Sequence, residues 1–104
     1  MIKAKKRPKA SLTIQNTCFK GFRIQIKKKR ITLGRHINND ICLDDPDVAL
    51  FQAEISWHDG QYFLENVDGR APSLVSGQAV KNTRLKSGCL IKIGRFVLKF
   101  SLDN

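Results

Sequence analysis

Few side chains in this chain have the types and the spacing that catalysis or metal binding requires. The two histidines, His36 and His58, stand in no ligand-like spacing with a cysteine or with each other. The sequence contains no serine nucleophile motif, no glycine-rich phosphate loop with a lysine, and no paired-carboxylate motif. We therefore expect no catalytic residue, no metal and no cofactor, and a protein that acts by binding another molecule.

The acidic run Asp44-Asp45-Pro46-Asp47 has the composition of a calcium-binding loop but not its pattern. Calcium loops alternate their oxygen ligands, turn at a central glycine and close with a glutamate. This run lacks that pattern, so we expect a solvated loop here.

A second polar constellation precedes the acidic run. Gly34 and Arg35 end one short apolar run, residues 38–40 read Asn-Asn-Asp, and another short run follows at residues 41–43. This pattern predicts two short strands joined by a tight glycine turn, and Arg35, Asn38 and Asn39 would lie in the connection between them. This connection is the first candidate for a binding surface.

The elements that must position these residues are predicted by apolar residues that alternate with polar ones. β-Branched and aromatic residues dominate the alternating runs, as a half-buried pleated surface prefers. The runs are residues 12–14, 22–26, 31–33, 41–43, 53–57, 61–65, 74–75, 78–80, 89–93 and 96–100. Their length and spacing predict an all-β fold, a two-sheet β-sandwich of about ten to eleven short strands.

Two dipeptides predict tight hairpins between these strands. Asp59-Gly60 and Ser76-Gly77 each lie between two alternating runs. A type I′ turn needs positive φ at both central positions, which glycine and aspartate tolerate.

The length and composition indicate one folded domain after a basic segment. The chain has 104 residues, of which 41% are hydrophobic and 27% charged, and these values are ordinary for a globular domain. Residues 1–10 hold five bases and one proline, and they cannot bury enough apolar surface to offset the entropy lost on ordering. We predict a disordered basic leader at residues 1–10 and the β-sandwich domain at residues 11–104.

The net charge of +10 is distributed in blocks. Residues 1–39 hold twelve bases and no acid, residues 40–68 hold eight acids and no base, and residues 69–104 hold seven bases and one acid. The leader and the basic run at residues 27–30 leave open an electrostatic binder of nucleic acid or of an anionic membrane. The alternating blocks also leave open head-to-tail association between copies.

The cysteines and the hydropathy pattern predict a cytoplasmic location. Cys18, Cys42 and Cys89 are an odd number and widely spaced, which argues against a disulfide framework. No apolar stretch reaches the ~18 residues that a membrane span needs. If the domain works at a membrane, we expect its anchor outside these residues.

The motifs and their order resemble the forkhead-associated (FHA) domain, a β-sandwich that reads phosphothreonine peptides through loops at one end. The family's opening motif is matched by residues 33–35 and 39–45, and its Val-Ser-Arg-x-His-Ala run falls on residues 48–53. Its closing Leu-x-x-Gly-Asp-x-Ile-x-Ile-Gly is echoed by residues 85–94. The resemblance implies structural roles for Gly34, Asp40, Gln52, Gly77, Gly88 and Gly94.

The same resemblance implies which positions would contact phosphate, and three of them have changed. Arg35 keeps the family's arginine, whereas Ala49 and Leu50 replace the serine and the basic residue that follows it. Ala71 replaces the pocket asparagine. Losing three such groups at about 1.5–3 kcal/mol each would lower phosphate affinity by several orders of magnitude. Arg70 and Ser73 remain as candidates for compensation.

Three functions are compatible with these residues. We favour a non-catalytic protein–protein interaction module that binds its partner without phosphothreonine. The first alternative is a phosphothreonine-peptide reader that uses Arg35 with Arg70 or Ser73. The second is the electrostatic binder of nucleic acid or anionic membrane.

The resemblance also extends to the cytoplasmic domains of inner-membrane ring proteins of type III secretion systems. Residues 72–80 and 87–90 are similar to that branch of the family, whereas the opening motif is similar to ordinary FHA domains. This likeness implies that the domain is the cytoplasmic part of a membrane-anchored secretion or signalling assembly.

Overall fold

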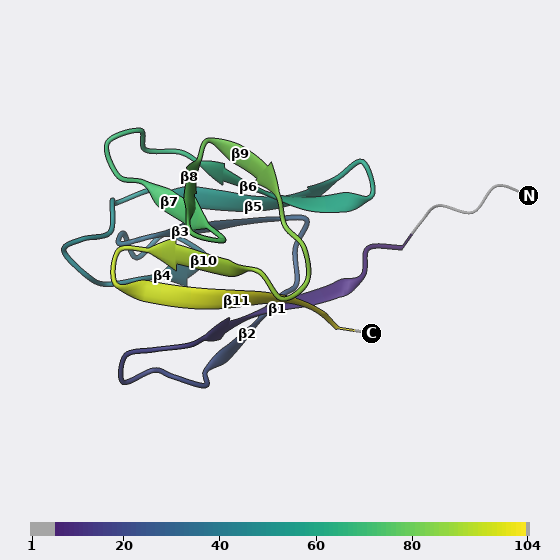
Figure 1. The fold of residues 1–104 in the computed structure, drawn as a ribbon, viewed down its shortest axis with the longest axis horizontal. Coiled ribbons are helices and arrows are strands. Elements are labelled where there is room, and N and C mark those ends of the chain that lie inside the picture. The colour runs from purple at the N-terminus through teal and green to yellow at the C-terminus, as the bar shows by residue number, and fades with distance from the viewer. Residues whose placement is uncertain (1–5, 104) are drawn as a thin grey trace, which may run out of the picture.

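A computed structural model describes residues 6–103 of the chain. Within these residues it contains eleven strands in two facing sheets and no helix (Figure 1), which confirms the predicted all-β sandwich. The first sheet has the order β2 (Arg23–Ile26), β1 (Lys9–Ile14), β11 (Phe96–Asp103), β10 (Leu90–Ile93), β7 (Ser73–Val75) and β8 (Gln78–Val80). The second has the order β4 (Ile41–Cys42), β3 (Arg30–Gly34), β5 (Ala53–His58), β6 (Gln61–Asn66) and β9 (Asn82–Arg84).

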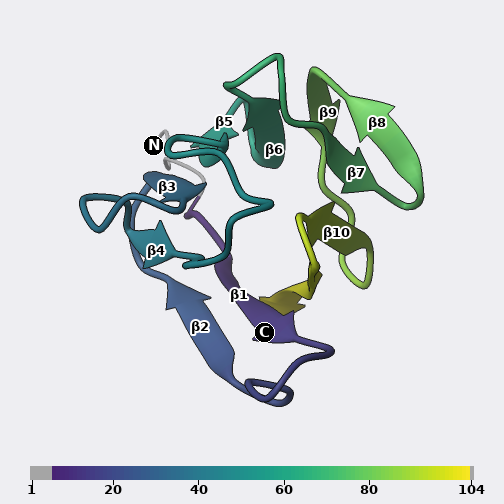
Figure 2. The same cartoon turned by 90° about the vertical axis from the view of Figure 1, so that its left-hand side faces the viewer.

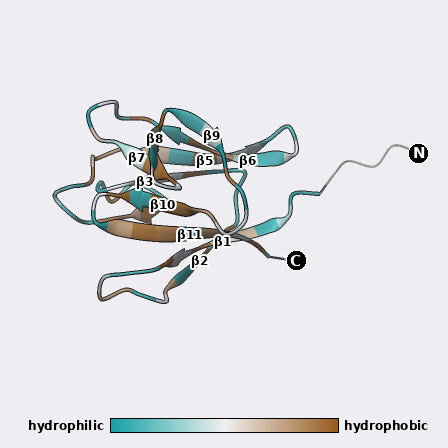
Figure 3. Ribbon diagram, in the orientation of Figure 1, coloured by the Kyte–Doolittle hydropathy of each residue, from teal (hydrophilic) through white to brown (hydrophobic). Residues whose placement is uncertain are grey.

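The core forms because the inward faces of the two sheets carry the apolar half of each alternating run. In β11, Phe96, Leu98 and Phe100 are buried, and this strand is largely brown in Figure 3. In the other sheet, Ile55 of β5 lies opposite Leu64 of β6, and both are buried. The buried side chains of both sheets form one cluster, whose removal from water drives the packing of the sheets.

The two predicted hairpins have the expected backbone. Asp59 and Gly60 have φ values of 52° and 76°, and Ser76 and Gly77 have φ values of 51° and 84°. Positive φ at both central positions is the condition of a type I′ turn, so both turn predictions are confirmed. Gly88, at the connection from β9 to β10, also has a positive φ of 93°.

The connections that concern function gather at one end of the sandwich. The loops from β3 to β4, from β4 to β5 and from β6 to β7 lie together at the left of Figure 1 and face the viewer in Figure 2. The opposite end contains the start of β1, where Lys9 pairs with Asp103 of β11. We call the first group, residues 35–40, 43–52 and 67–72, the loop end.

The folded domain begins earlier than the predicted boundary at residue 11. Strand β1 starts at Lys9, and the guanidinium of Arg7 donates to the carbonyls of Lys27 at 2.8 Å and Lys28 at 2.9 Å. Residues 7–10 of the predicted leader are therefore tied to the domain. Residues 1–5 of that leader lie outside the described residues.

Strand β9 is an element that the alternation of apolar residues does not predict. Its sequence is Asn-Thr-Arg, and it forms the edge of its sheet by pairing with β6. A short edge strand needs no apolar face of its own, because backbone hydrogen bonds to the neighbouring strand hold it in the sheet.

Candidate partner-binding site at the loop end

Hydrogen bonds to backbone carbonyls join two loops of the loop end. The backbone N–H groups of Arg35 and His36 donate to the carbonyls of Ala49 at 2.9 Å and Leu50 at 3.1 Å. The side-chain Nδ2 of Asn39 donates to the carbonyls of Leu50 at 2.8 Å and His36 at 2.9 Å. Asn39 is buried, so this predicted binding candidate holds the loops together and does not face a partner.

Two glycines permit the close approach of these loops. A Cβ on Gly34 would lie 2.7 Å from Nδ2 of Asn39 and closer still to the carbonyl oxygen of Leu50. A Cβ on Gly94 would lie 2.8 Å from Cγ2 of Val48, and Gly94 also has a positive φ of 57°. Their structural roles follow from these clashes, since contacts under 3 Å would force the loops apart.

Asp40 fixes the other side of the first loop. Its carboxylate accepts hydrogen bonds from the backbone N–H of Thr32 at 2.9 Å and from Nζ of Lys28 at 2.5 Å. The hydrogen bond from Lys28, with that from Thr32, lowers the pKa of Asp40 below its ordinary value. Asp40 thus joins the start of β4 to β3.

The acidic run is largely the solvated loop that was predicted, since Asp44, Pro46 and Asp47 are exposed, but one of its residues departs from that prediction. Asp45 is buried, and its carboxylate forms an ion pair with Arg95, whose Nε lies 2.5 Å away, and accepts a hydrogen bond from the backbone N–H of Asp47 at 2.9 Å. The ion pair explains the burial, because a carboxylate is stable in the interior only when it is paired. Among the described residues, no group of three or more His, Cys, Asp or Glu could hold a metal ion.

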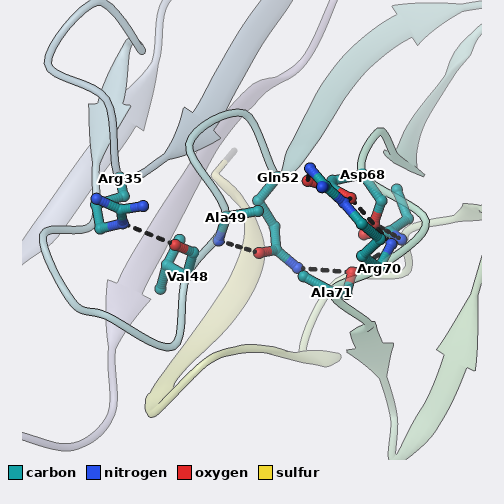
Figure 4. Close-up of polar contacts among 8 residues, drawn as sticks. Arg35, Val48, Ala49, Gln52, Asp68, Arg70 and Ala71 are labelled. Atoms are coloured by element: carbon teal, nitrogen blue, oxygen red, sulfur yellow. Dashed lines mark hydrogen bonds and ion pairs between the residues drawn. The ribbon is translucent and has the colours of Figure 1, made fainter.

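Gln52 is the centre of the loop end's interior. Its side chain has no exposed surface, and its Oε1 accepts from the backbone N–H of Ala49 at 2.9 Å. Its Nε2 donates to the carbonyls of Ala71 and Pro72 at 3.1 Å and to Oγ of Ser73 at 3.2 Å (Figure 4). The side-chain amide of Gln52 therefore positions the loop from β4 to β5 and the loop from β6 to β7, each through backbone groups.

Ser73 belongs to this interior network and not to the outer surface. It has no exposed surface, and its hydroxyl donates to Oδ1 of Asn66 at 2.6 Å. The same oxygen accepts a hydrogen bond from Gln52, so the hydroxyl is occupied both as a donor and as an acceptor. The structure thus places this candidate phosphate ligand away from solvent.

The outer surface contains Arg35, the one arginine kept from the family pattern. Its Nε donates to the carbonyl of Val48 at 3.1 Å, and the residue is exposed. This hydrogen bond holds the guanidinium against the loop from β4 to β5 (Figure 4). Ala49, the next residue along that loop, is half-buried and offers no side-chain donor.

Arg70 is not brought together with Arg35. Figure 4 shows the two arginines on opposite sides of the segment that carries Ala49 and Gln52. Arg70 is paired with Asp68 of its own loop through Nε and a terminal nitrogen, both at 3.2 Å. The pair lowers the pKa of Asp68 and raises that of Arg70, mainly through their side-chain hydrogen bonds.

Leu50, a predicted candidate, lies in the loop end with two other exposed apolar side chains, Ile37 and Phe51, which sequence reasoning did not select. Ile37, Leu50 and Phe51 are 83%, 45% and 50% exposed. The ring of Phe51 stacks on His36 with centroids 5.2 Å apart, and Nδ1 of His36 accepts from the backbone N–H of the exposed Asn38. The sequence signal that could have identified this surface is the run Ala-Leu-Phe at residues 49–51, whose first two positions hold a hydroxyl and a base in the family. We call Ile37, Leu50 and Phe51 the apolar cap.

The model that describes the FHA domain matches residues 31–94 of this chain. This match covers more than half of the sequence and includes the loop end. The chain belongs to the FHA family. An oxoglutarate dehydrogenase inhibitor from Corynebacterium diphtheriae is 32% identical to this FHA chain over 80 residues. Those residues are 77% of this chain and 56% of that relative, so the chain spans about half the length of the curated protein.

Solved structures confirm the fold of this FHA domain. EmbR of Mycobacterium tuberculosis in complex with a low-affinity phosphopeptide has a TM-score of 0.84 at 21% identity, over 92% of this chain and 25% of that one. The cytoplasmic domain of PscD, a sorting-platform protein of the type III secretion system of P. aeruginosa, has a TM-score of 0.75 at 16% identity. That likeness covers 91% of this chain and 81% of PscD's. The fold is thus shared with both branches that the sequence resembled.

The described part of this FHA domain also lacks any helix long and apolar enough to cross a membrane.

Proposed function

We propose that this FHA domain is a non-catalytic interaction module whose loop end binds a protein partner without requiring phosphothreonine. The apolar cap is the observation that carries this proposal. Leu50 stands at the position where the family has a basic residue, and Phe51 follows it. Both extend into solvent, and their burial on a partner would contribute about 25 cal/mol for each Å² removed from water.

The polar groups of the loop end support the same proposal. A dianionic phosphate requires several charge-assisted donors that converge on it. Here Ser73 is buried and engaged, and Arg70 is paired with Asp68 away from Arg35. Arg35 alone supplies one cation, which suits an acidic or neutral partner surface beside the cap.

A phosphothreonine reader is the second candidate, and a specific observation favours it. Only Nε of Arg35 takes part in a hydrogen bond among the described residues, so its terminal nitrogens can still meet phosphate. The phosphopeptide in the EmbR complex is consistent with this candidate, because that protein shares the fold. The ion pair of Arg70 is exposed and worth little, so a phosphate could draw Arg70 from Asp68.

A titration distinguishes the two candidates. The ¹⁵N-labelled domain is titrated with a degenerate phosphothreonine peptide library and with its unphosphorylated twin, and amide shifts are followed by NMR. We expect no phosphate-dependent shift at Arg35 or Arg70. A triple variant, Ala49→Ser with Leu50→Arg and Ala71→Asn, serves as the positive control and should gain such shifts. Phosphate-dependent shifts in the unchanged domain would overturn the proposal in favour of the reader.

The role of the apolar cap needs a second measurement. Proteins retained by the domain from a host lysate should be the same with or without prior phosphatase treatment, and Phe51→Asp should release them. Leu90→Asp is the matched control, because Leu90 is similarly exposed, at 46%, but lies on β10 outside the loop end. Equal retention by both variants, or loss after phosphatase treatment, would contradict the proposal.

We also propose a cytoplasmic location within a membrane-anchored secretion or signalling assembly. The described structure has three free cysteines, Cys18, Cys42 and Cys89, which suit a reducing compartment. The shared fold with the cytoplasmic domain of PscD supports the assembly context.

A further inference from the structure

An apolar groove lies on the side of the sandwich where the edge strands of the two sheets approach each other. Strand β2 ends one sheet and β4 ends the other, and the two lie next to each other in Figure 2. The groove between them has a volume of about 420 Å³, and Ile24 of β2 and Ile41 of β4 line it. It lies outside the apolar cap of the loop end.

Two aromatic side chains on the rim of this groove are exposed. Phe19 and Phe22, in the connection from β1 to β2, are 47% and 62% exposed, and their ring centroids are 6.0 Å apart. A paired aromatic patch next to an apolar groove is uncommon on a soluble surface unless a partner covers it. The fold itself does not require these rings, because they stand outside its buried cluster.

The backbone of β2 has a free edge beside the groove. Among the strands of residues 6–103, β2 pairs with β1 alone, and the backbone N–H of Ile14 donates to the carbonyl of Phe22 in that ladder. In an antiparallel ladder, successive residues direct their backbone N–H and C=O groups alternately toward the neighbouring strand and away from it. The backbone groups of Ile24 therefore also face β1, whereas the N–H and C=O groups of Arg23 and Gln25 point to the free edge. An added strand would find these backbone groups available, and its inward side chains would meet the groove.

The charges around the groove indicate the chemistry of that strand. Lys20 and Lys27 are exposed around β2, and Arg23 on β2 is exposed but paired with Asp103 at 2.7 Å, whereas Asp44 is the one acidic residue among those that line the groove. The whole chain has a net charge of +10, which opposes the docking of a second copy at this edge. An acidic segment would be attracted to it.

We propose that this groove binds an extended acidic segment of a partner protein. The segment adds as a strand to β2 through the backbone of Arg23 and Gln25, and inserts its apolar side chains between β2 and β4. This surface is separate from the apolar cap, so the inference stands whether or not the loop end requires phosphate.

The test uses a peptide library as its probe. Seven-residue peptides that alternate apolar residues with Asp or Glu are titrated into the ¹⁵N-labelled domain, and a library with Lys or Arg at the charged positions is the control. We expect shifts and slowed amide exchange at Arg23 and Gln25 with the acidic library only, weakening as salt is added. Equal response to both libraries, or no response along β2, would overturn the proposal.

Two variants distinguish the contribution of the apolar groove to peptide binding from that of the free edge of β2. Phe22→Ser removes an exposed apolar contact, and we expect about tenfold weaker binding, as for a central interface aromatic. Gln25→Pro removes one N–H from the free edge, where edge strands tolerate proline, and should weaken binding without altering the groove. Leu102→Ser is the matched control, since Leu102 is exposed on β11 away from the groove.

Sedimentation tests the competing occupant. The domain should sediment as a monomer at low salt and high concentration. A dimer that Phe22→Ser dissociates would show that a second copy fills the groove, and would overturn the choice of an acidic partner segment.

Discussion

The loop end and the groove between β2 and β4 both expose aromatic side chains, but they differ in what lies beneath. Phe51 of the loop end stands beside Gln52, which is fully buried and hydrogen-bonded both within its own loop and to the loop from β6 to β7. Phe22 of the groove stands above apolar core residues such as Ile14 and Phe96. One surface rests on a polar network and the other on the hydrophobic core.

This difference shows how each surface obtains a defined shape. Loops have no ladder to fix their backbone, so the loop end needs buried amides that bind specific N–H and C=O groups. The groove is bordered by strands whose ladders already fix it. The outer residues of the loop end can therefore change, as Ala49 and Leu50 have, while Gln52 and Asn39 keep the loops in place.

The largest effect is expected at Gln52. Replacing it by leucine leaves the N–H of Ala49 and the carbonyl of Pro72 without their partner and leaves the carbonyl of Ala71 with Asn66 alone. We expect Gln52→Leu to lower the free energy of unfolding by about 3 kcal/mol, measured by urea denaturation. Gln78→Leu on the exposed strand β8 is the control and should change it by less than about 0.5 kcal/mol. Similar values for both would mean that the network does not hold the loop end.

An intermediate effect is expected at Gly34. In Gly34→Ala the new Cβ would meet the carbonyl of Leu50 and Nδ2 of Asn39, at a cost of about 2 kcal/mol for overpacking. Gly69→Ala is the matched control, because a Cβ there meets nothing within 4 Å. NMR shifts should be concentrated in the loop end and in β4, which pairs with Gly34, and should be absent from β2. Shifts along β2 would break the proposed independence of the two surfaces.

The smallest effect is expected at Asp40, which lies where the loop end meets β4, the strand that borders the groove. Its folded-state pKa is lowered, so its contribution to stability is present above the ordinary pKa of 3.8 and is lost as the pH falls through the lower folded value. At neutral pH, Asp40→Asn should cost about 1 kcal/mol, since the contact with Lys28 is largely exposed. Denaturation at a series of pH values should show the difference from the unchanged domain shrink progressively as the pH falls below 3.8. A constant difference would refute the assignment.

Much of the fold could be predicted because local patterns and the structure agree. The alternation at residues 53–57 and 61–65 and the turn at Asp59-Gly60 act through neighbouring residues, and β5, β6 and their hairpin follow. Strand β9 was missed because its Asn-Thr-Arg sequence has no apolar face. The start of β1 was missed because Arg7 is held by carbonyls about twenty residues away.

The candidate site was predicted less completely. The sequence identified Arg35, Ala49, Leu50 and Arg70 through the family resemblance, and they all lie in the loop end. It did not reveal that Ser73 is buried or that Ile37 and Phe51 are exposed. Side-chain direction in a loop depends on distant partners, such as Asn66 for Ser73, and no local period encodes it.

The sequence by itself determined that this protein is a basic β-sandwich of the FHA family with changed phosphate-contacting positions, because strand alternation, turn residues and motif order are local properties. Only the tertiary structure decided that Arg35 and Arg70 stand apart, that Asp45 is buried against Arg95, and that β2 and β4 enclose an apolar groove. These features join residues far apart in the chain, and their energies depend on burial and distance, which exist only once the two sheets have packed.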